Sequence, residues 1–174
     1  ASGAFARFML SPKNLLIRVA TSTFSVAALG DIVFGIICLG IYAVIIEASA
    51  FQILLMFLLA IISTVVFLAA VILAYSFSFF FIDAGSVTGG IFELFFTPSL
   101  FHGGAFQGTM RFVFTFIVPS LLIGTLPVEI TKNISLWELL LISGLAIFWF
   151  VFSIKVFNKA VRKYESSNFM TFGS

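Results

Sequence analysis

Four long runs of apolar residues constrain this chain more than any other feature of its sequence. They lie at about residues 26–46, 51–82, 110–128 and 136–157. A helix needs about 20 apolar residues to cross the hydrocarbon core of a bilayer. Each run approaches or exceeds that length, and none shows the period-two alternation of barrel strands. We therefore expect an all-α, polytopic membrane helix bundle with four transmembrane helices.

The composition supports a membrane location and argues against nucleic acid as a partner. Of the 174 residues, 61% are hydrophobic and only 9% are charged, whereas soluble domains carry about 25% charged residues. The net charge is +2, but the cations are not pooled into one basic face. We expect residues 1–174 to form a single transmembrane domain that interacts with the lipid bilayer and not with nucleic acid.

The distribution of Lys and Arg predicts the orientation. With four spans, the segments 1–24, 83–109 and 158–174 share one side of the membrane, with the cations on or near it: Arg7, Lys13, Arg18, Arg111, Lys155, Lys159, Arg162 and Lys163. Only Lys132 lies opposite. The positive-inside rule makes the first side cytoplasmic, together with both termini. Glu129 is then expected outside, across the membrane from Arg111.

The central loop has an unusual composition for a cytoplasmic segment. Glycines bracket the phenylalanine-rich run "IFELFFTPSLF", and few charges accompany its large apolar side chains. One interpretation is an interfacial segment that lies on the membrane surface. The alternative is a loop packed against the spans. Gly85 and Gly89 match a helix-packing pattern, but they fall outside any apolar span.

Two prolines interrupt the third run. Proline removes a helical hydrogen bond and clashes with the preceding turn, so we expect a bend at Pro119. Thr115 and nearby polar side chains can satisfy the carbonyl groups that the bend frees. Pro119 is either a hinge that moves during a functional cycle or a static kink. Pro127 is expected to end the span.

Charged residues near the spans are further candidates for functional residues. Arg111 is predicted to anchor the third span at the cytoplasmic interface, or to pair with Glu93 or Asp83. Asp31 is expected near a helix N-terminus, where the helix dipole favours a carboxylate. It is either a helix-end residue or a polar contact that lines a pathway or meets a partner. His102 lacks neighbouring Cys or His residues, so no metal site is expected.

Residues 97–127, "TPSLFHGGAFQGTMRFVFTFIVPSLLIGTLP", resemble a signature of permease subunits of ATP-binding-cassette transporters, in the type-2 exporter-like group. The matching elements are Pro98, Phe101, Gly103 or Gly104, Arg111, Thr115 to Pro119, Leu126 and Pro127. The segment "FMLSPKNLLIRVATSTFSVAALGDIVFGII" and the ending "NKAVRKYESSN" are similar to other parts of that family, in the same order. The chain departs from the pattern at Thr97, where the family usually has tyrosine.

The resemblance implies a transport subunit of an export system, in the inner membrane of a prokaryote. Such a permease forms a pathway with a second permease, as a homodimer or heterodimer, and is driven by a separate ATPase subunit. It also implies that the chain is a C-terminal fragment, because family members usually have six spans. By the same resemblance, the residues that would couple to the ATPase are Arg7, Phe8, Met9, Leu10, Pro12 and Lys13. The alternative for that segment is an amphipathic stretch that touches only lipid headgroups.

The chain lacks the G-x-x-x-x-G-K-[ST] loop that cradles ATP phosphates. We therefore expect no cofactor and no catalytic residue in this chain, with ATP and Mg²⁺ bound by the partner ATPase. One alternative is a non-transporting membrane scaffold or assembly protein. A more remote one is an intramembrane aspartyl protease that uses Asp31 and Asp83, but the Gly-x-Gly-Asp and Tyr-Asp patterns of such enzymes are missing.

Overall fold

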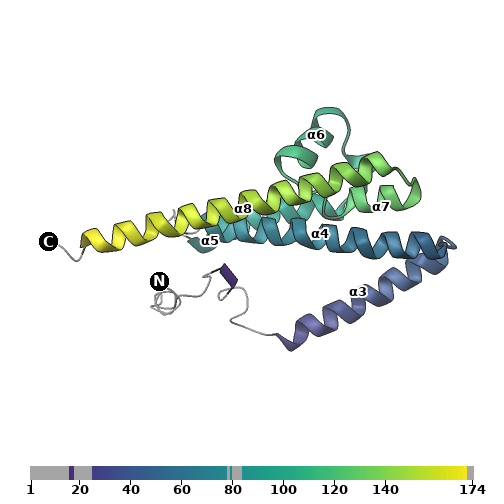
Figure 1. Cartoon of the computed structure of the whole chain (residues 1–174), viewed down its shortest axis with the longest axis horizontal. Coiled ribbons are helices and arrows are strands. Elements are labelled where there is room, and N and C mark those ends of the chain that lie inside the picture. Colours follow the sequence, from purple (N-terminus) through teal and green to yellow (C-terminus); the bar gives the residue numbers. More distant parts are fainter. Residues whose placement is uncertain (1–15, 18–24, 78, 80–83, 172–174) are drawn as a thin grey trace. The chain divides into compact units, whose positions relative to one another are not determined.

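The computed structural model describes residues 16–17, 25–77, 79 and 84–171, and it has helices and no strands in this part of the chain. The all-helical prediction is confirmed for these residues. The chain divides into two units, residues 1–48 and 49–174, and each is described by itself. Figure 1 labels the helices.

The first unit contains helix α3, Val26–Ile45, whose 20 residues match the first predicted span. None of its residues is buried within the unit. The helix ends in a tight turn in which Glu47 has a φ of 51°. A helix that is apolar except for Asp31 and lacks a buried face is suited to contact with lipid.

Two long helices form the framework of the second unit. Helix α4 is Ala50–Phe77 and helix α8 is Leu136–Thr171. Both starts are set by local sequence: the Ser49 backbone N–H donates to Gln52 Oε1 at 2.9 Å, and the Glu138 N–H donates to Ser135 Oγ at 3.4 Å. Ser followed three residues later by Gln or Glu is the capping-box pattern.

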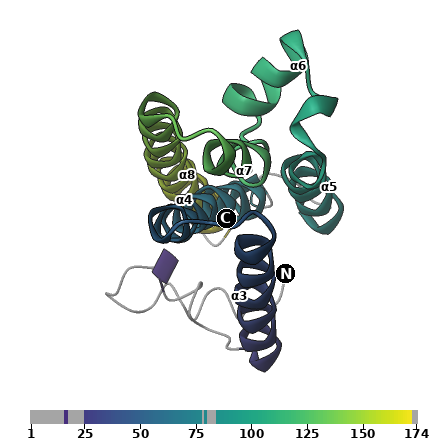
Figure 2. The same cartoon turned by 90° about the vertical axis from the view of Figure 1, so that its right-hand side faces the viewer.

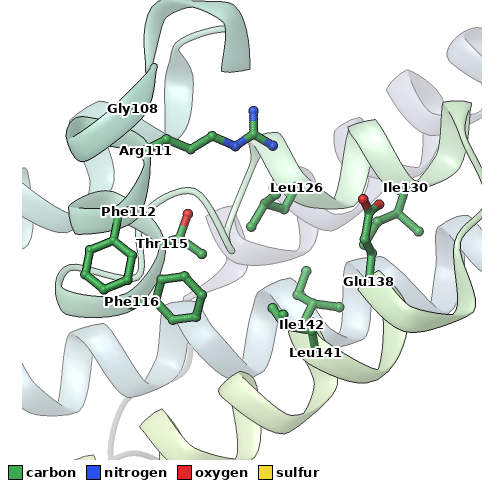
Figure 3. A pocket seen from close by; sticks show the side chains of 10 residues that line it. All are labelled: Gly108, Arg111, Phe112, Thr115, Phe116, Leu126, Ile130, Glu138, Leu141 and Ile142. Carbon is green, nitrogen blue, oxygen red and sulfur yellow. The ribbon is translucent and has the colours of Figure 1, made fainter.

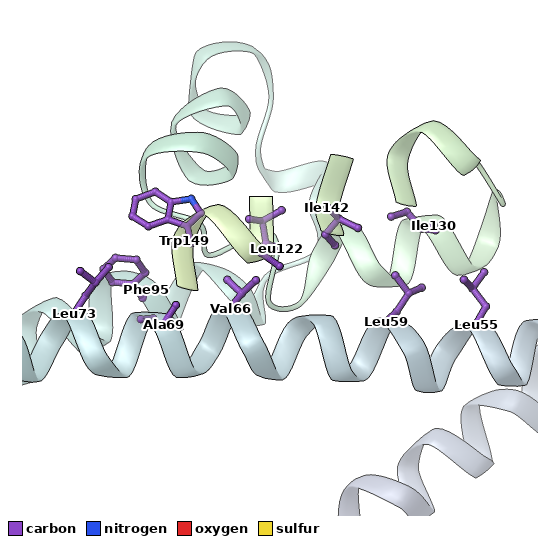
Figure 4. Packing of buried hydrophobic residues seen from close by; sticks show 12 residues of the cluster. Leu55, Leu59, Val66, Ala69, Leu73, Phe95, Leu122, Ile130, Ile142 and Trp149 are labelled. Carbon is purple, nitrogen blue, oxygen red and sulfur yellow. The ribbon is translucent and has the colours of Figure 1, made fainter. Parts of the chain in front are cut away.

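Helices α4 and α8 lie side by side and run in the same direction (Figures 1 and 4). Ile142 lies beside the middle of α4, while Trp149 lies closer to its Leu73 end. The buried cluster that joins the two helices to the segment connecting them is apolar and consists of Leu55, Leu59, Val66, Ala69, Ala70, Leu73, Phe95, Leu122, Ile130, Ile142, Ala146 and Trp149. Because the two helices are parallel, the chain between them must travel back along α4.

That return path is made by two helices, α5, Ala84–Phe96, and α7, Thr125–Lys132. Phe95 of α5 lies near the Leu73 end of α4, and Ile130 of α7 lies near its Leu55 end (Figure 4). In the view of Figure 2, α7 lies between α8 and α5. The return path is therefore split into two pieces that follow one another along α4.

A folded segment, here called the inserted loop (residues 97–124), joins α5 to α7. It contains the 3-10 turns Thr97–Leu100 and Gly103–Ala105, the short helix α6, Gly108–Phe112, and a π-helical turn, Val113–Ile117. The loop closes on itself, because Gly124 at its end lies against the backbone carbonyl of Ser99 near its start. Thr125 Oγ1 also donates to the Phe101 carbonyl at 3.1 Å.

The prediction of one helix over residues 110–128 is wrong. This segment contains the end of α6, the π-helical turn, a reversal and the start of α7. The reason is Pro119, which has no N–H to continue the helix and forces the preceding residue out of helical geometry. Among the described residues, three helices are long and apolar enough to cross a membrane, α3, α4 and the first part of α8.

Helix α5 lies within the segment predicted to be a central cytoplasmic loop. It packs against α4 through aromatic rings: the ring centroid of Phe67 is 5.9 Å from that of Phe92 and 6.1 Å from that of Phe96. The structure thus shows the arrangement of the second interpretation, a segment packed against a long helix. The interfacial segment is not confirmed.

Candidate functional site

The predicted site residues fall in different parts of the chain. The predicted coupling residues Arg7, Phe8, Met9, Leu10, Pro12 and Lys13 lie outside the described residues, as does Asp83. Asp31 is exposed on α3, and Glu93 is exposed on α5. The remaining candidates, Arg111, Thr115, Pro119 and Pro127, come together in the inserted loop and the start of α7. This region is the candidate functional site.

The chain reverses its direction at Pro119. Val118 is extended, with φ −118° and ψ 93°, which is the geometry favoured before a proline. The Leu121 N–H reaches back to the Phe114 carbonyl at 3.0 Å, and Ser120 Oγ donates to the Val118 carbonyl at 3.1 Å. Carbonyl groups that the broken helix would leave unpaired thus receive donors from the reversal itself. Movement at this bend stays a prediction.

Pro127 begins a helix and does not end one, which corrects the prediction made for it. It is the third residue of α7 and lies in the first helical turn, where a missing N–H removes no intrahelical bond. The Pro127 carbonyl accepts a hydrogen bond from Thr131 Oγ1 at 2.9 Å. Gly124 is the N-cap residue of α7 and provides no side-chain capping bond, so Pro127 is the helix-start signal that the sequence contains.

Arg111 forms an ion pair with Glu129. Arg111 Nη2 lies 2.5 Å from Glu129 Oε2, and Nη1 lies 3.4 Å from Oε1. Two nitrogen atoms of the guanidinium group therefore donate to the two oxygen atoms of the carboxylate. The side chains are 43% and 36% exposed, respectively. The expected pairing of Arg111 with Glu93 is not what the structure shows. The expected separation of Arg111 and Glu129 by the membrane is also wrong, because the two groups touch.

Two glycines of the inserted loop lie in close contacts, Gly103 against α7 and Gly124 against the start of the loop itself. Gly103 is buried, and a Cβ atom there would collide with Glu129 Oε1 and would lie 2.5 Å from Thr125 Cγ2. A Cβ atom at Gly124 would collide with the Ser99 carbonyl oxygen. At Gly124 the obstacle is a backbone atom, so glycine is required there for the loop to close on itself. At Gly103 the obstacles are side-chain atoms of α7, which would have to shift to admit a Cβ atom. A Cβ atom at Gly103 would thus displace the Glu129 carboxylate that pairs with Arg111.

Two cavities lie on opposite faces of α7. One, of about 310 Å³, lies between the inserted loop and α8 and includes Arg111, Leu126 and Ile130 in its lining (Figure 3). The other, of about 470 Å³, is lined by residues of the first part of the loop and by Glu129 and Lys132. Arg111 lines the first cavity and Glu129 lines the second, so their ion pair connects the walls of the two cavities.

The described residues contain no group of three His, Cys, Asp or Glu side chains that could hold a metal ion. His102 instead begins the turn Gly103–Ala105, where its Nδ1 accepts the Gly104 N–H at 3.0 Å. The histidine thus shapes the backbone of the inserted loop.

The sequence was compared with known protein families, curated proteins and solved structures. Residues 1–168 match the family described as "ABC-2 family transporter protein". The chain belongs to the ABC-2 transporter family. The comparisons with curated proteins and with solved structures gave no match. The resemblance to permease subunits of ATP-binding-cassette transporters is thereby confirmed.

Membership of the ABC-2 transporter family assigns the chain to a class of multi-pass membrane proteins. Members of the family are transport components of the membrane and are not themselves catalytic. Because the chain is a permease of this kind, the inserted loop is part of a transport subunit. Sequence reasoning had missed Glu129 as the partner of Arg111, since the two residues are 18 positions apart, at opposite ends of a run that reads as one apolar span.

A double-mutant cycle tests the Arg111–Glu129 pair in this ABC-2 permease. We expect Arg111→Gln and Glu129→Gln each to lower the free energy of unfolding by about 1–2 kcal/mol, because each leaves a half-buried charge unpaired. The double variant should lose less than the sum, with a coupling of about 1 kcal/mol. Thermal unfolding of the purified chain in detergent gives the four values. Purely additive losses would show that the two charges do not interact.

Proposed function

We propose that this chain is the membrane-spanning subunit of an ABC exporter, in which it forms the translocation pathway with a second permease. A separate ATPase subunit binds ATP and Mg²⁺ and drives the cycle. The match of residues 1–168 to the ABC-2 transporter family is the observation that carries this proposal. The second permease is either another copy of this chain or a related one.

The proposal includes four membrane crossings, with the third assigned to α5 and α7. At 1.5 Å per residue these helices are about 20 Å and about 12 Å long, and together they match a hydrocarbon core of about 30 Å. Their positions along α4, from its Leu73 end to its Leu55 end, support the assignment. Four crossings leave both ends of the chain on the same side.

We place that shared side in the cytoplasm of a prokaryote, with the chain in the inner membrane. Lys155, Lys159 and Arg162 of α8 lie about 19 or more residues after its start, a distance that spans the hydrocarbon core. Arg111, now beside Glu129, moves to the outer half, but its charge is compensated by that carboxylate. The excess of the remaining cations therefore stays on the cytoplasmic side.

Three further roles belong to this proposal. The segment with Phe8 and Leu10 docks on the ATPase, in keeping with its apolar patch between Arg7 and Lys13. The reversal at Pro119 acts as a hinge of the inserted loop. Asp31, which is exposed on α3, contacts the partner permease or the pathway.

Co-purification tests the proposal. Extraction of the full chain from its native membrane should bring down a nucleotide-binding subunit that contains a P-loop. Phe8→Ala together with Leu10→Ala should reduce the amount of that subunit several-fold, because the variants remove the apolar patch. Phe148→Ala, at an exposed position of α8, is the matched control and should leave the association unchanged. A complex that never contains an ATPase would instead favour a membrane scaffold.

A further inference from the structure

The cavity between the inserted loop and α8 has a lining of mixed chemistry (Figure 3). Its walls are mostly apolar and carry Phe112 and Phe116 on the loop side and Leu141 and Ile142 on the α8 side. Two charged residues, Arg111 and Glu138, also line it. A volume of about 310 Å³ is at the small end of the range of ligand pockets. This volume suits a ligand with one alkyl chain or a small ring system.

The two charges differ in what they can offer a ligand. The guanidinium group of Arg111 is already held by both carboxylate oxygens of Glu129. The Glu138 side chain is exposed, and no cation forms an ion pair with it in the part of the chain that the structure describes. The groups in and beside the cavity are therefore two carboxylates, Glu129 and Glu138, and one cation, Arg111. Because Arg111 is paired with Glu129, the charge available to a ligand is the negative charge of Glu138.

The polar and apolar parts of the cavity are arranged along α8. Glu138 is in the first turn of the helix, while Leu141 and Ile142 are one turn further on. One turn advances the helix by about 5 Å, so in a membrane the apolar part lies deeper than the carboxylate. An amphiphile with its headgroup at the membrane boundary has the same order of parts.

We propose that this cavity binds an amphiphile that carries a protonated amine, with the ammonium group at Glu138 and the apolar body against Phe116 and Ile142. The ligand is either a lipid of the surrounding bilayer or a molecule that the transporter carries. The inference rests on the proposed membrane function, and it names a ligand class for that permease. An anionic amphiphile would be the weaker ligand, because it would have to displace Glu129 from Arg111.

Binding of octadecylamine, compared with octadecanoate, tests the proposal on the full chain in phosphatidylcholine nanodiscs without ATP. We expect octadecylamine to bind at least tenfold more tightly. Glu138→Gln should abolish this preference, and Phe116→Ala should weaken binding of both probes several-fold. Glu47→Gln and Phe148→Ala, which change an acid and an aromatic residue outside the cavity, should bind as the unaltered chain does.

The outcomes separate the ligand site from the transport function. Equal binding of the two probes, stronger binding of octadecanoate, or an unchanged preference in Glu138→Gln would overturn the proposed site, while co-purification of an ATPase would be unaffected. If phosphatidylethanolamine is retained through purification by the unaltered chain and lost in Glu138→Gln, the ligand is a bilayer lipid. If added octadecylamine instead stimulates ATP hydrolysis by the complete complex, the ligand is a transported molecule.

Discussion

Replacing Gly124 with alanine is expected to destabilise this permease more than any other single methyl addition. The new Cβ atom would collide with the backbone carbonyl oxygen of Ser99, which cannot rotate away as a side chain could. Overpacking a tight contact costs about 1–3 kcal/mol, and we expect a loss near 3 kcal/mol here. For a chain of this size, such a loss lowers the midpoint of thermal unfolding by roughly 6–12 °C.

Gly90→Ala is the matched control for this substitution. Gly90 is exposed on α5, and a Cβ atom there would meet no atom within 4 Å. Alanine within a helix is favoured over glycine by about 0.5–1 kcal/mol, so this variant should be as stable as the unaltered chain or slightly more stable. Thermal unfolding in one detergent compares the two variants. Equal midpoints would show that residues 99 and 124 do not meet.

The second large effect is expected for Leu122→Ala. The Leu122 side chain is fully buried and belongs to the cluster that joins the return path to α4 and α8, beside Val66 and Ile142 (Figure 4). Removing its buried methyl groups leaves a cavity and should cost about 2–5 kcal/mol. Leu140→Ala, at a site on α8 that is 68% exposed, should change stability by much less.

Measurement of the unfolding free energy of both leucine variants checks this expectation. A loss in Leu122→Ala no greater than that in Leu140→Ala would mean that residue 122 faces lipid. That result is the one expected if residues 110–128 formed a single crossing helix, since most of the surface of such a helix would be available to the bilayer.

Helices α4 and α8 could be predicted from sequence because each combines an apolar run with a local start signal. Ser49 with Gln52 and Ser135 with Glu138 mark the first residues of α4 and α8. Helix α5 was harder to predict, since Gly85, Gly89 and Gly90 lower its helix propensity. Its packing of Phe92 and Phe96 against Phe67 overrides that local preference.

The inserted loop could be predicted only in part, and for a physical reason. Hydropathy reports whether side chains avoid water, and it does not distinguish a crossing helix from a chain that reverses inside an apolar environment. The pairing of Arg111 with Glu129 depends on that reversal and on the lack of a side chain at Gly103. The two prolines carried the missing information, because Pro119 ends one helix and Pro127 lies in the first turn of the next.

The distance between spin labels at positions 101 and 128 shows whether residues 97–124 leave the return path and rejoin it at the same point. Phe101→Cys and Val128→Cys, in a Cys38→Ser background, place the labels at two exposed residues that line the same cavity of about 470 Å³. We expect strong dipolar broadening, because the two labels would be neighbours. A separation of about 30 Å, the thickness of the hydrocarbon core, would mean instead that a single helix crosses between the labels and that the inserted loop does not close on itself.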